Sequence, residues 1–300
     1  MNITEPGRIA ERIVLLGRRE SYVSLIDGGS ELALLGGAMS YVVPEVLEQV
    51  ERFGIDVKKI TRVVILHSHF DHCGMIPFLK KRWPWAVVTA SAKAKDLLST
   101  PKVSQTIAAM NAAAAARYGR SDEVRRLGAE FTGIEVEQTV DDGDVLTCGD
   151  LELRVVGVPG HSSCSIALYE PTLKALFPSD AAGIACGDFF LSAGSSSFDQ
   201  YQQSLEKLSA LDVDVLCKEH YGAHVGDDAR GYLARSIVEA ARTRDLLVRA
   251  WRASRDITKA TEAALDEISA GYPADFLPRE ILTIVVSQMV GYIARTIGDA

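Results

Sequence analysis

The chain has 300 residues, of which 47% are hydrophobic and 24% charged. It is long enough to bury a large core, and this composition excludes a disordered, collagen-like or coiled-coil protein. Forty acidic against 32 basic residues give a net charge of −8, which excludes nucleic acid as the default partner because phosphate binding requires a basic face.

Neither end of the chain suggests export or a membrane. Residues 1–11 lack the apolar core of a secretory signal, and no run of about eighteen apolar residues predicts a membrane span. The five cysteines are scattered without a CxxC motif, which is typical of reduced thiols rather than of a disulfide framework. We therefore expect a cytoplasmic protein with no membrane association.

The first third of the chain alternates apolar strands with helices, which predicts an α/β layer. The strand at residues 62–66 is an almost continuously apolar, β-branched run, so we expect it to be buried on both faces. In chain order the pattern predicts strands at 13–16, 22–26 and 31–35, a helix at 43–53, the strand at 62–66, a helix at 76–83 and a strand at 86–89.

The rest of the chain divides into a mixed and a helical part. Residues 92 to about 128 form a predicted helical insert with five consecutive alanines, the strongest helix formers. From residue 227 we expect only helices, broken near 271–273 and 277–278, with 281–286 helical. Between them the pattern predicts strands at 135–137, 151–156, 165–169 and 175–177, a turn at 141–144, a helix at 198–211 and a strand at 213–216.

Four side chains that can bind metal directly follow the strand at 62–66, namely His67, His69, Asp71 and His72. Neutral imidazole binds zinc or iron well, and a carboxylate adds charge and hardness. Residues 67 and 69 project to the same side of an extended segment, so both imidazoles can hold one ion. The following turn can direct Asp71 and His72 to a second ion.

This motif resembles the HxHxDH signature of the metallo-β-lactamase superfamily. Three later positions also fit that pattern: His161 after a Pro-Gly turn, Asp180 after a short strand, and His220 after a late strand. The resemblance covers roughly residues 10–226. It implies an α/β fold, the αββα sandwich, with the catalytic domain at 1–226, the helical insert at about 92–128, and a helical extension at 227–300 that covers the site.

The resemblance also implies the ligand set. His67, His69 and His161 would hold one ion, Asp71, His72 and His220 a second, and Asp180 would bridge both. Asp180 could instead be a helix N-cap, and His161 a turn residue.

His224 competes with His220 for the last ligand place. We favour His220, because His-x-Gly directly after the strand resembles the family pattern, and we leave His224 as a loop or pocket-mouth residue. The usual residue before this histidine is Gly, and here it is Glu219.

Such a site implies a hydrolase in which a hydroxide that bridges two cations is the nucleophile, with Asp71 as a ligand that also orients it. No cysteine occupies an implied ligand place, so zinc, iron and manganese all suit the site; Cys73 is expected to be buried beside it. The metal site does not identify the substrate.

Flanking residues favour one branch of the superfamily. Residues 67–77 and 274–278 resemble the quinolone-signal response protein and related thioesterases, which implies an acyl thioester of coenzyme A or an acyl carrier protein. Glyoxalase II-like thioesterases share the core, but the C-terminal part does not clearly show their basic glutathione-binding residues. The alternatives are a lactone or phosphoester hydrolase of the same fold, or a regulatory binding protein with a slow metal site.

Apolar residues outside the motif suggest a substrate pocket. Phe189 and Phe190 follow the Asp180 strand, where the superfamily often places substrate contacts. The C-terminal helices are amphipathic, which is compatible with three roles: packing on the α/β body, walling an apolar tunnel, or forming a homodimer interface.

Overall fold

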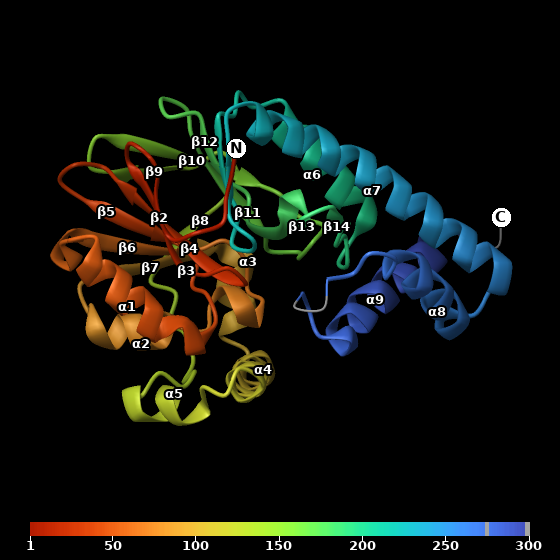
Figure 1. Ribbon diagram of the computed structural model, residues 1–300, viewed down its shortest axis with the longest axis horizontal. Helices are drawn as coiled ribbons and strands as arrows, with labels where there is room; N and C mark the ends of the chain where they lie inside the picture. The colour runs from red at the N-terminus through yellow and green to blue at the C-terminus, as the bar shows by residue number, and fades with distance from the viewer. Residues whose placement is uncertain (274–275, 298–300) are drawn as a thin grey trace. The chain divides into compact units, whose positions relative to one another are not determined.

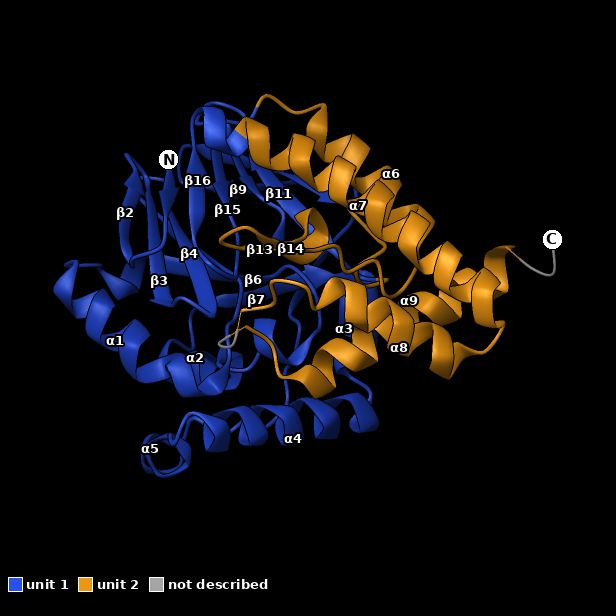
Figure 2. Cartoon of the chain, turned by 45° about the vertical axis from the view of Figure 1, so that its right-hand side comes forward, with its two compact units in different colours: residues 1–157, 164–179, 213–229 blue, residues 158–163, 180–212, 230–300 orange. Residues whose placement is uncertain are grey.

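The computed structural model describes residues 1–273 and 276–297, so residues 274–275 of the segment compared above lie outside the described part. The chain forms two compact units (Figure 2). Unit 1 comprises residues 1–157, 164–179 and 213–229; unit 2 comprises 158–163, 180–212 and 230–300. The chain therefore enters unit 2 twice before its C-terminal helices. The domain boundary at residue 226, and the covering of the site by the extension, stay predictions.

Unit 1 is built on two seven-stranded sheets in the described part of the chain (Figure 1). Sheet 1 runs in the order β2 (Gly7–Ala10), β3 (Ile13–Arg18), β4 (Ser21–Asp27), β5 (Leu32–Leu35), β6 (Ile60–Ile65), β7 (Val87–Ser91), β8 (Gln138–Val140). Sheet 2 runs in the order β1 (Asn2–Ile3), β16 (Ala223–Val225), β15 (Val215–Cys217), β12 (Ala175–Phe177), β11 (Ile166–Glu170), β10 (Leu151–Gly157), β9 (Val145–Cys148).

Strand β6 shows how the core is arranged. Val63 and Ile65 pack in a cluster with apolar residues of the helices on the outer face of sheet 1, whereas Val64 and Leu66 pack in a second cluster between the two sheets. The prediction that this strand is buried on both faces is therefore confirmed. The helices of unit 1 are α1 (Val43–Arg52), α2 (Ile76–Arg82), α3 (Ala92–Leu98), α4 (Pro101–Arg117) and α5 (Ser121–Leu127).

The helical insert is confirmed as helices α3 to α5. Helix α4 buries one narrow stripe, Ile107, Asn111 and Ala115, at the i, i+4 spacing of one helix face. The strand expected at 135–137 was wrong by three residues, because pairing with β7 begins where Gln138 lies opposite Thr89.

Unit 2 combines a hairpin with long helices: β13 (Ile184–Cys186), β14 (Phe189–Leu191), α6 (Phe198–Ser209), α7 (Asp227–Ser254), α8 (Ile257–Ile268) and α9 (Arg279–Ile297). The hydroxyls of Tyr232 and Ser236 on α7 donate to the carbonyls of Gly183 and Ala182, 2.7 and 2.8 Å away. These bonds attach α7 to the segment that follows Asp180.

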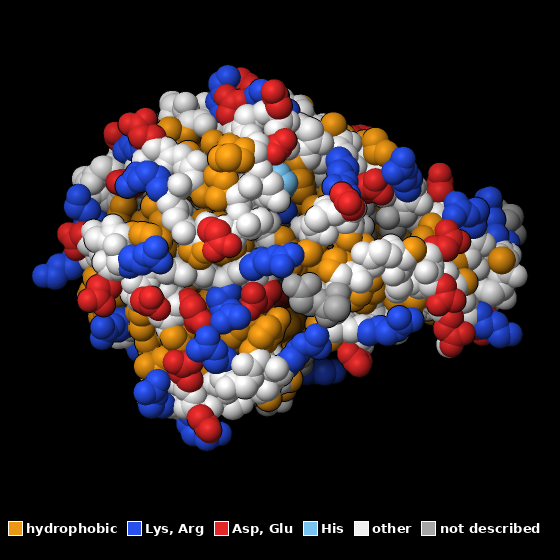
Figure 3. Space-filling model, viewed as in Figure 1, with side chains coloured by type: hydrophobic (Ala, Val, Ile, Leu, Met, Phe, Trp, Pro, Cys, Tyr) orange, Lys and Arg blue, Asp and Glu red, His pale blue; other side chains and the backbone are white. Residues whose placement is uncertain are grey.

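Helix α9 confirms that residues 281–286 are helical. It is the one helix in the described part of the chain that is long and apolar enough to cross a membrane by length and composition alone. A third of its apolar window is buried inside the protein, including Leu282, Val286 and Met289. On the face drawn in Figure 3, acidic and basic side chains are interspersed.

Candidate metal centre

The topology of unit 1 brings distant loops to one edge of its sheets. His67 follows β6 directly. In sheet 2, β12 and β15 pair in parallel, so the loops after them leave at the same edge. Leu66 at the end of β6 accepts a 2.9 Å hydrogen bond from the backbone N–H of Ile166, which starts β11. This bond joins the two sheets where these loops emerge.

Three donor atoms converge beyond this edge. Nε2 of His72 lies 3.1 Å from Nε2 of His220, and each of these nitrogens lies 3.6 Å from Oδ2 of Asp71. A triangle of this size suits a cation about 2 Å from each atom, the usual distance for zinc bound by imidazole and carboxylate. The donor set therefore fits a divalent ion, and the grouping agrees with the implied place of Asp71, His72 and His220.

The far side of each imidazole is held in place. Nδ1 of His220 lies 2.7 Å from the backbone carbonyl of Glu20, and Nδ1 of His72 lies 2.9 Å from Oε2 of Glu219. The carbonyl of Glu20 keeps the proton of His220 on Nδ1 and leaves the Nε2 lone pair of that ring for a metal. The contact of His72 with Glu219 is a close approach to a carboxylate rather than a hydrogen bond, and it holds the ring in place.

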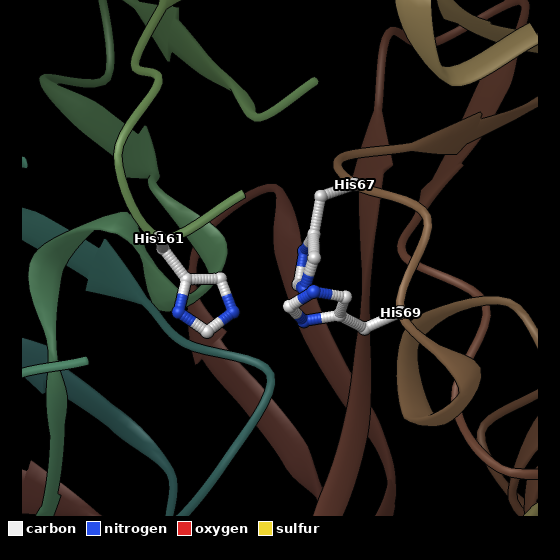
Figure 4. Close-up of side chains that lie close together, drawn as sticks. All are labelled: His67, His69 and His161. Carbon is white, nitrogen blue, oxygen red and sulfur yellow. The ribbon is translucent and has the colours of Figure 1, made fainter. Parts of the chain in front are cut away.

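His67 and His69 lie on the same loop, with ring centroids 4.6 Å apart and rings almost perpendicular (Figure 4). Nδ1 of His67 is hydrogen-bonded to the hydroxyl of Ser179 at 3.0 Å, and its ring centroid lies 4.0 Å from that of His72. The loop therefore presents three imidazoles close together, and their division between two ions stays a prediction.

His161 and Asp180 belong to unit 2 and lie close to each other there. Nδ1 of His161 is 2.9 Å from the carbonyl oxygen of Ala193, and its Nε2 is 3.5 Å from Oδ2 of Asp180. Asp180 lies inside the short 3₁₀ helix η4 (Ser179–Ala182) rather than at its N-cap. That both residues share ions with the unit 1 ligands stays a prediction.

The implied pocket residues lie in different surroundings. Phe189 and Phe190 line a cavity of about 420 Å³ in unit 2, together with Arg235, Leu246 and Ile268. His224 lies on β16 of unit 1, opposite Asn2 of β1 and Leu216 of β15. Whether these residues contact a substrate stays a prediction.

Comparison with known proteins identifies the family. The family model described as "Metallo-beta-lactamase superfamily" matches residues 16–220. The chain belongs to the metallo-beta-lactamase superfamily. A metallo-beta-lactamase family protein from Thermus thermophilus has a TM-score of 0.65 at 16% identity, covering 96% of this chain and 94% of that one. At this identity the match shows the fold alone, and it confirms the predicted fold class.

Two curated relatives carry the name hydroxyacylglutathione hydrolase. The one from Brucella anthropi is 35% identical over 144 residues, 45% of this chain and 53% of that protein. The one from Rhodopseudomonas palustris is 26% identical over 194 residues, 63% of this chain and 59% of that protein. The chain thus spans little more than half the length of these relatives, and their name is not that of the quinolone-signal branch.

The sequence alone did not single out Asn111. This residue of helix α4 holds the loop that carries Asp71 and His72. Its amide nitrogen donates to the carbonyl of Phe70 and its oxygen accepts from the N–H of Ser40, both at 2.8 Å. Phe70 starts the 3₁₀ helix η3 (Phe70–His72), which carries Asp71 and His72. The only signal in the sequence is a polar residue in the buried stripe of an alanine-rich helix.

We expect Asn111→Ala to lower the free energy of unfolding by about 2–4 kcal/mol, because two buried backbone groups lose their partners. It should also weaken metal binding by Asp71 and His72. Denaturant unfolding and metal titration measure the two effects. Gln105→Ala, on the exposed face of the same helix, is the control and should stay within about 0.5 kcal/mol. If Asn111→Ala were as stable as this control, the stabilising role of the Asn111 hydrogen bonds to Phe70 and Ser40 would be wrong.

The five cysteines are free and buried. Burial raises the pKa of the Cys73 thiol well above its usual range and raises the pKa of Cys148 to about 11. Cys73 Sγ donates to the carbonyl of His69 at 3.1 Å, which agrees with a buried residue beside the site rather than a ligand.

Because the thiolate is the reactive form, we expect native protein at about pH 8 to react slowly with a disulfide reagent, whereas unfolded protein exposes every thiol. Absorbance from the released reagent thiolate, with and without denaturant, measures this. Rapid native labelling of Cys73, located by mass spectrometry, would contradict its placement.

Proposed function

We propose that the protein is a metal-dependent hydrolase that cleaves an acyl thioester. The convergence of Asp71, His72 and His220, with both imidazoles oriented through Nδ1, carries the proposal. We further propose two ions, of zinc, iron or manganese, with His67, His69 and His161 on one, Asp71, His72 and His220 on the other, and Asp180 between them.

Bound divalent ions would supply an activated water and would polarise the carbonyl group that is cleaved. The chain contributes the orientation of the donors. Glu20 and Glu219 already hold the far sides of His220 and His72. These imidazoles therefore do not have to reorient during the reaction, which would cost free energy. A thiolate is a good leaving group, so thioester cleavage needs little proton donation from the protein.

Two similarities point to different carriers of the acyl group. Curated relatives are named for a hydroxyacyl group on glutathione, whereas the residues around the motif resemble the branch that implies coenzyme A or an acyl carrier protein. We propose a coenzyme A or acyl carrier protein thioester as the substrate, with an acylated glutathione as the competing result of the test.

The test is thiol release from aliphatic and aromatic acyl-CoA thioesters, an acyl carrier protein thioester and a hydroxyacylglutathione. Protein loaded separately with zinc, iron and manganese is compared with metal-free protein. Release that requires metal and favours one carrier supports the proposal and names the carrier. If the protein cleaved only lactones or phosphoesters, the proposed thioester substrate would be wrong. A protein with metal shown bound that is inactive on every substrate would favour a regulatory binding protein.

A further inference from the structure

Glu219 is a carboxylate buried beside the histidines, and the residue is 4% exposed. Oε2 lies 2.9 Å from Nδ1 of His72 and accepts a hydrogen bond from the hydroxyl of Ser179. Oε1 lies against Gly36, where an added Cβ would be only 2.3 Å away. The absence of a side chain at Gly36 thus makes room for this carboxylate.

Ser179 connects the same carboxylate to a second histidine. Its backbone has φ +50°, a conformation that non-glycine residues rarely adopt and that is retained where the surroundings enforce it. The side chain is fully buried, and its oxygen lies 3.0 Å from Nδ1 of His67. Glu219 therefore reaches His72 directly and His67 through one hydroxyl.

The direction of these contacts decides which nitrogen of His67 carries the proton. The Ser179 hydroxyl donates its single proton to Oε2 of Glu219. The hydroxyl oxygen can then only accept from His67, which places the His67 proton on Nδ1 and leaves its Nε2 lone pair available. The same carboxylate lies 2.9 Å from Nδ1 of His72. One acidic residue thus contacts His72 directly and fixes the proton of His67 through Ser179.

We propose that Glu219 is a positioning residue shared by both ions, which holds His72 by direct contact and sets the tautomer of His67 through Ser179. This inference rests on the metal centre of the proposed function but not on its substrate. Removal of Glu219 must therefore weaken both ions, whereas removal of the Ser179 hydroxyl must weaken mainly the ion held by His67.

The experiment compares wild type with Glu219→Ala, Glu219→Gln and Ser179→Ala. Competitive titration of metal-free protein with cobalt(II), followed by its absorption spectrum, yields the two dissociation constants. Loss of a residue that orients a metal ligand typically costs about 10–100-fold in affinity, so Glu219→Ala should raise both constants by that factor. Ser179→Ala should raise one of them. Glu219→Gln keeps the shape but can donate as well as accept, so it should raise both by less.

Glu170→Gln is the matched control. Glu170 is 1% exposed and accepts from the backbone N–H of Leu173 at 2.6 Å and from the hydroxyl of Thr172. Its replacement removes a buried carboxylate from unit 1 without touching a histidine of the site, so both dissociation constants should stay unchanged. Thermal unfolding of the metal-free variants shows whether each one folds.

Long-range ¹H–¹⁵N spectra of metal-free protein with labelled histidine report the tautomers directly. His67 should carry the proton on Nδ1 in wild type and should lose this preference in Glu219→Ala. An unchanged His67 tautomer, or cobalt constants that change no more than in Glu170→Gln, would overturn the proposal. Complete loss of one ion with the other unaffected would overturn it as well, and would make Glu219 a ligand. A wild-type protein that binds no ion would overturn the metal centre, whereas a metal-replete wild type without thioesterase activity would overturn only the proposed reaction.

Discussion

We expect His72→Ala to lose the ion held by Asp71, His72 and His220 and to lower hydrolysis by roughly a thousandfold, a loss of the size seen when a group that stabilises the transition state is removed. His72 is fully buried, and its Nε2 lies 3.1 Å from that of His220. Alanine therefore removes one corner of the donor triangle and leaves two atoms to hold the ion. Metal content by atomic emission and the rate of thiol release measure the two effects.

Two further variants make this result specific. His72→Asn keeps a polar side chain, so it separates loss of the ligand from loss of volume in the core. His224→Ala removes the competing histidine on β16, and it should keep the full metal content. If His224→Ala lost the ion while His220→Ala kept it, the assignment of the last ligand would be wrong.

The second large effect is expected at Gly160, in the Pro-Gly turn before His161. Gly160 has φ +130°, and an added Cβ would lie 2.2 Å from the backbone nitrogen of Tyr201 and 2.3 Å from its Cα. The Gly160 carbonyl also accepts from the N–H groups of Ser196 and Ser197, both at 3.0 Å. Backbone atoms cannot rotate away as a flexible side chain can, so alanine must displace the whole turn.

We therefore expect Gly160→Ala to lower the free energy of unfolding by about 3–5 kcal/mol, which is the exceptional range for one substitution. It should also displace His161 and weaken metal binding. Denaturant unfolding and metal titration measure both effects. Gly187→Ala is the control, because Gly187 has φ +61° with nothing within 4 Å of an added Cβ. In that variant the free energy of unfolding should fall by only about 1–2 kcal/mol, which is the cost of the left-handed backbone conformation for alanine. Equal losses in the two variants would contradict the steric argument.

The sequence by itself determined the superfamily and the local part of the metal centre. The four ligand types at residues 67–72 lie within one loop, and the apolar run before them predicts a buried strand; both features are local in the chain. For the same reason the insert and the C-terminal helices were predicted as helical. The short strands β1, β2, β9, β13, β14 and β16 were not predicted, because two to four residues carry too little periodicity to be recognised without their partners.

Only the tertiary structure decided how the ligands are held. Glu219 and Ser179 lie more than 100 residues along the chain from the histidines that they contact, and Asn111 lies 41 residues from Phe70. Glu219 was noticed in the sequence only as a departure from the usual glycine. Its contact with His72 arises because strand β15 and the loop after β6 end at the same edge of unit 1. Such contacts depend on sheet order and on the exact course of the backbone, and neither is a property of local sequence.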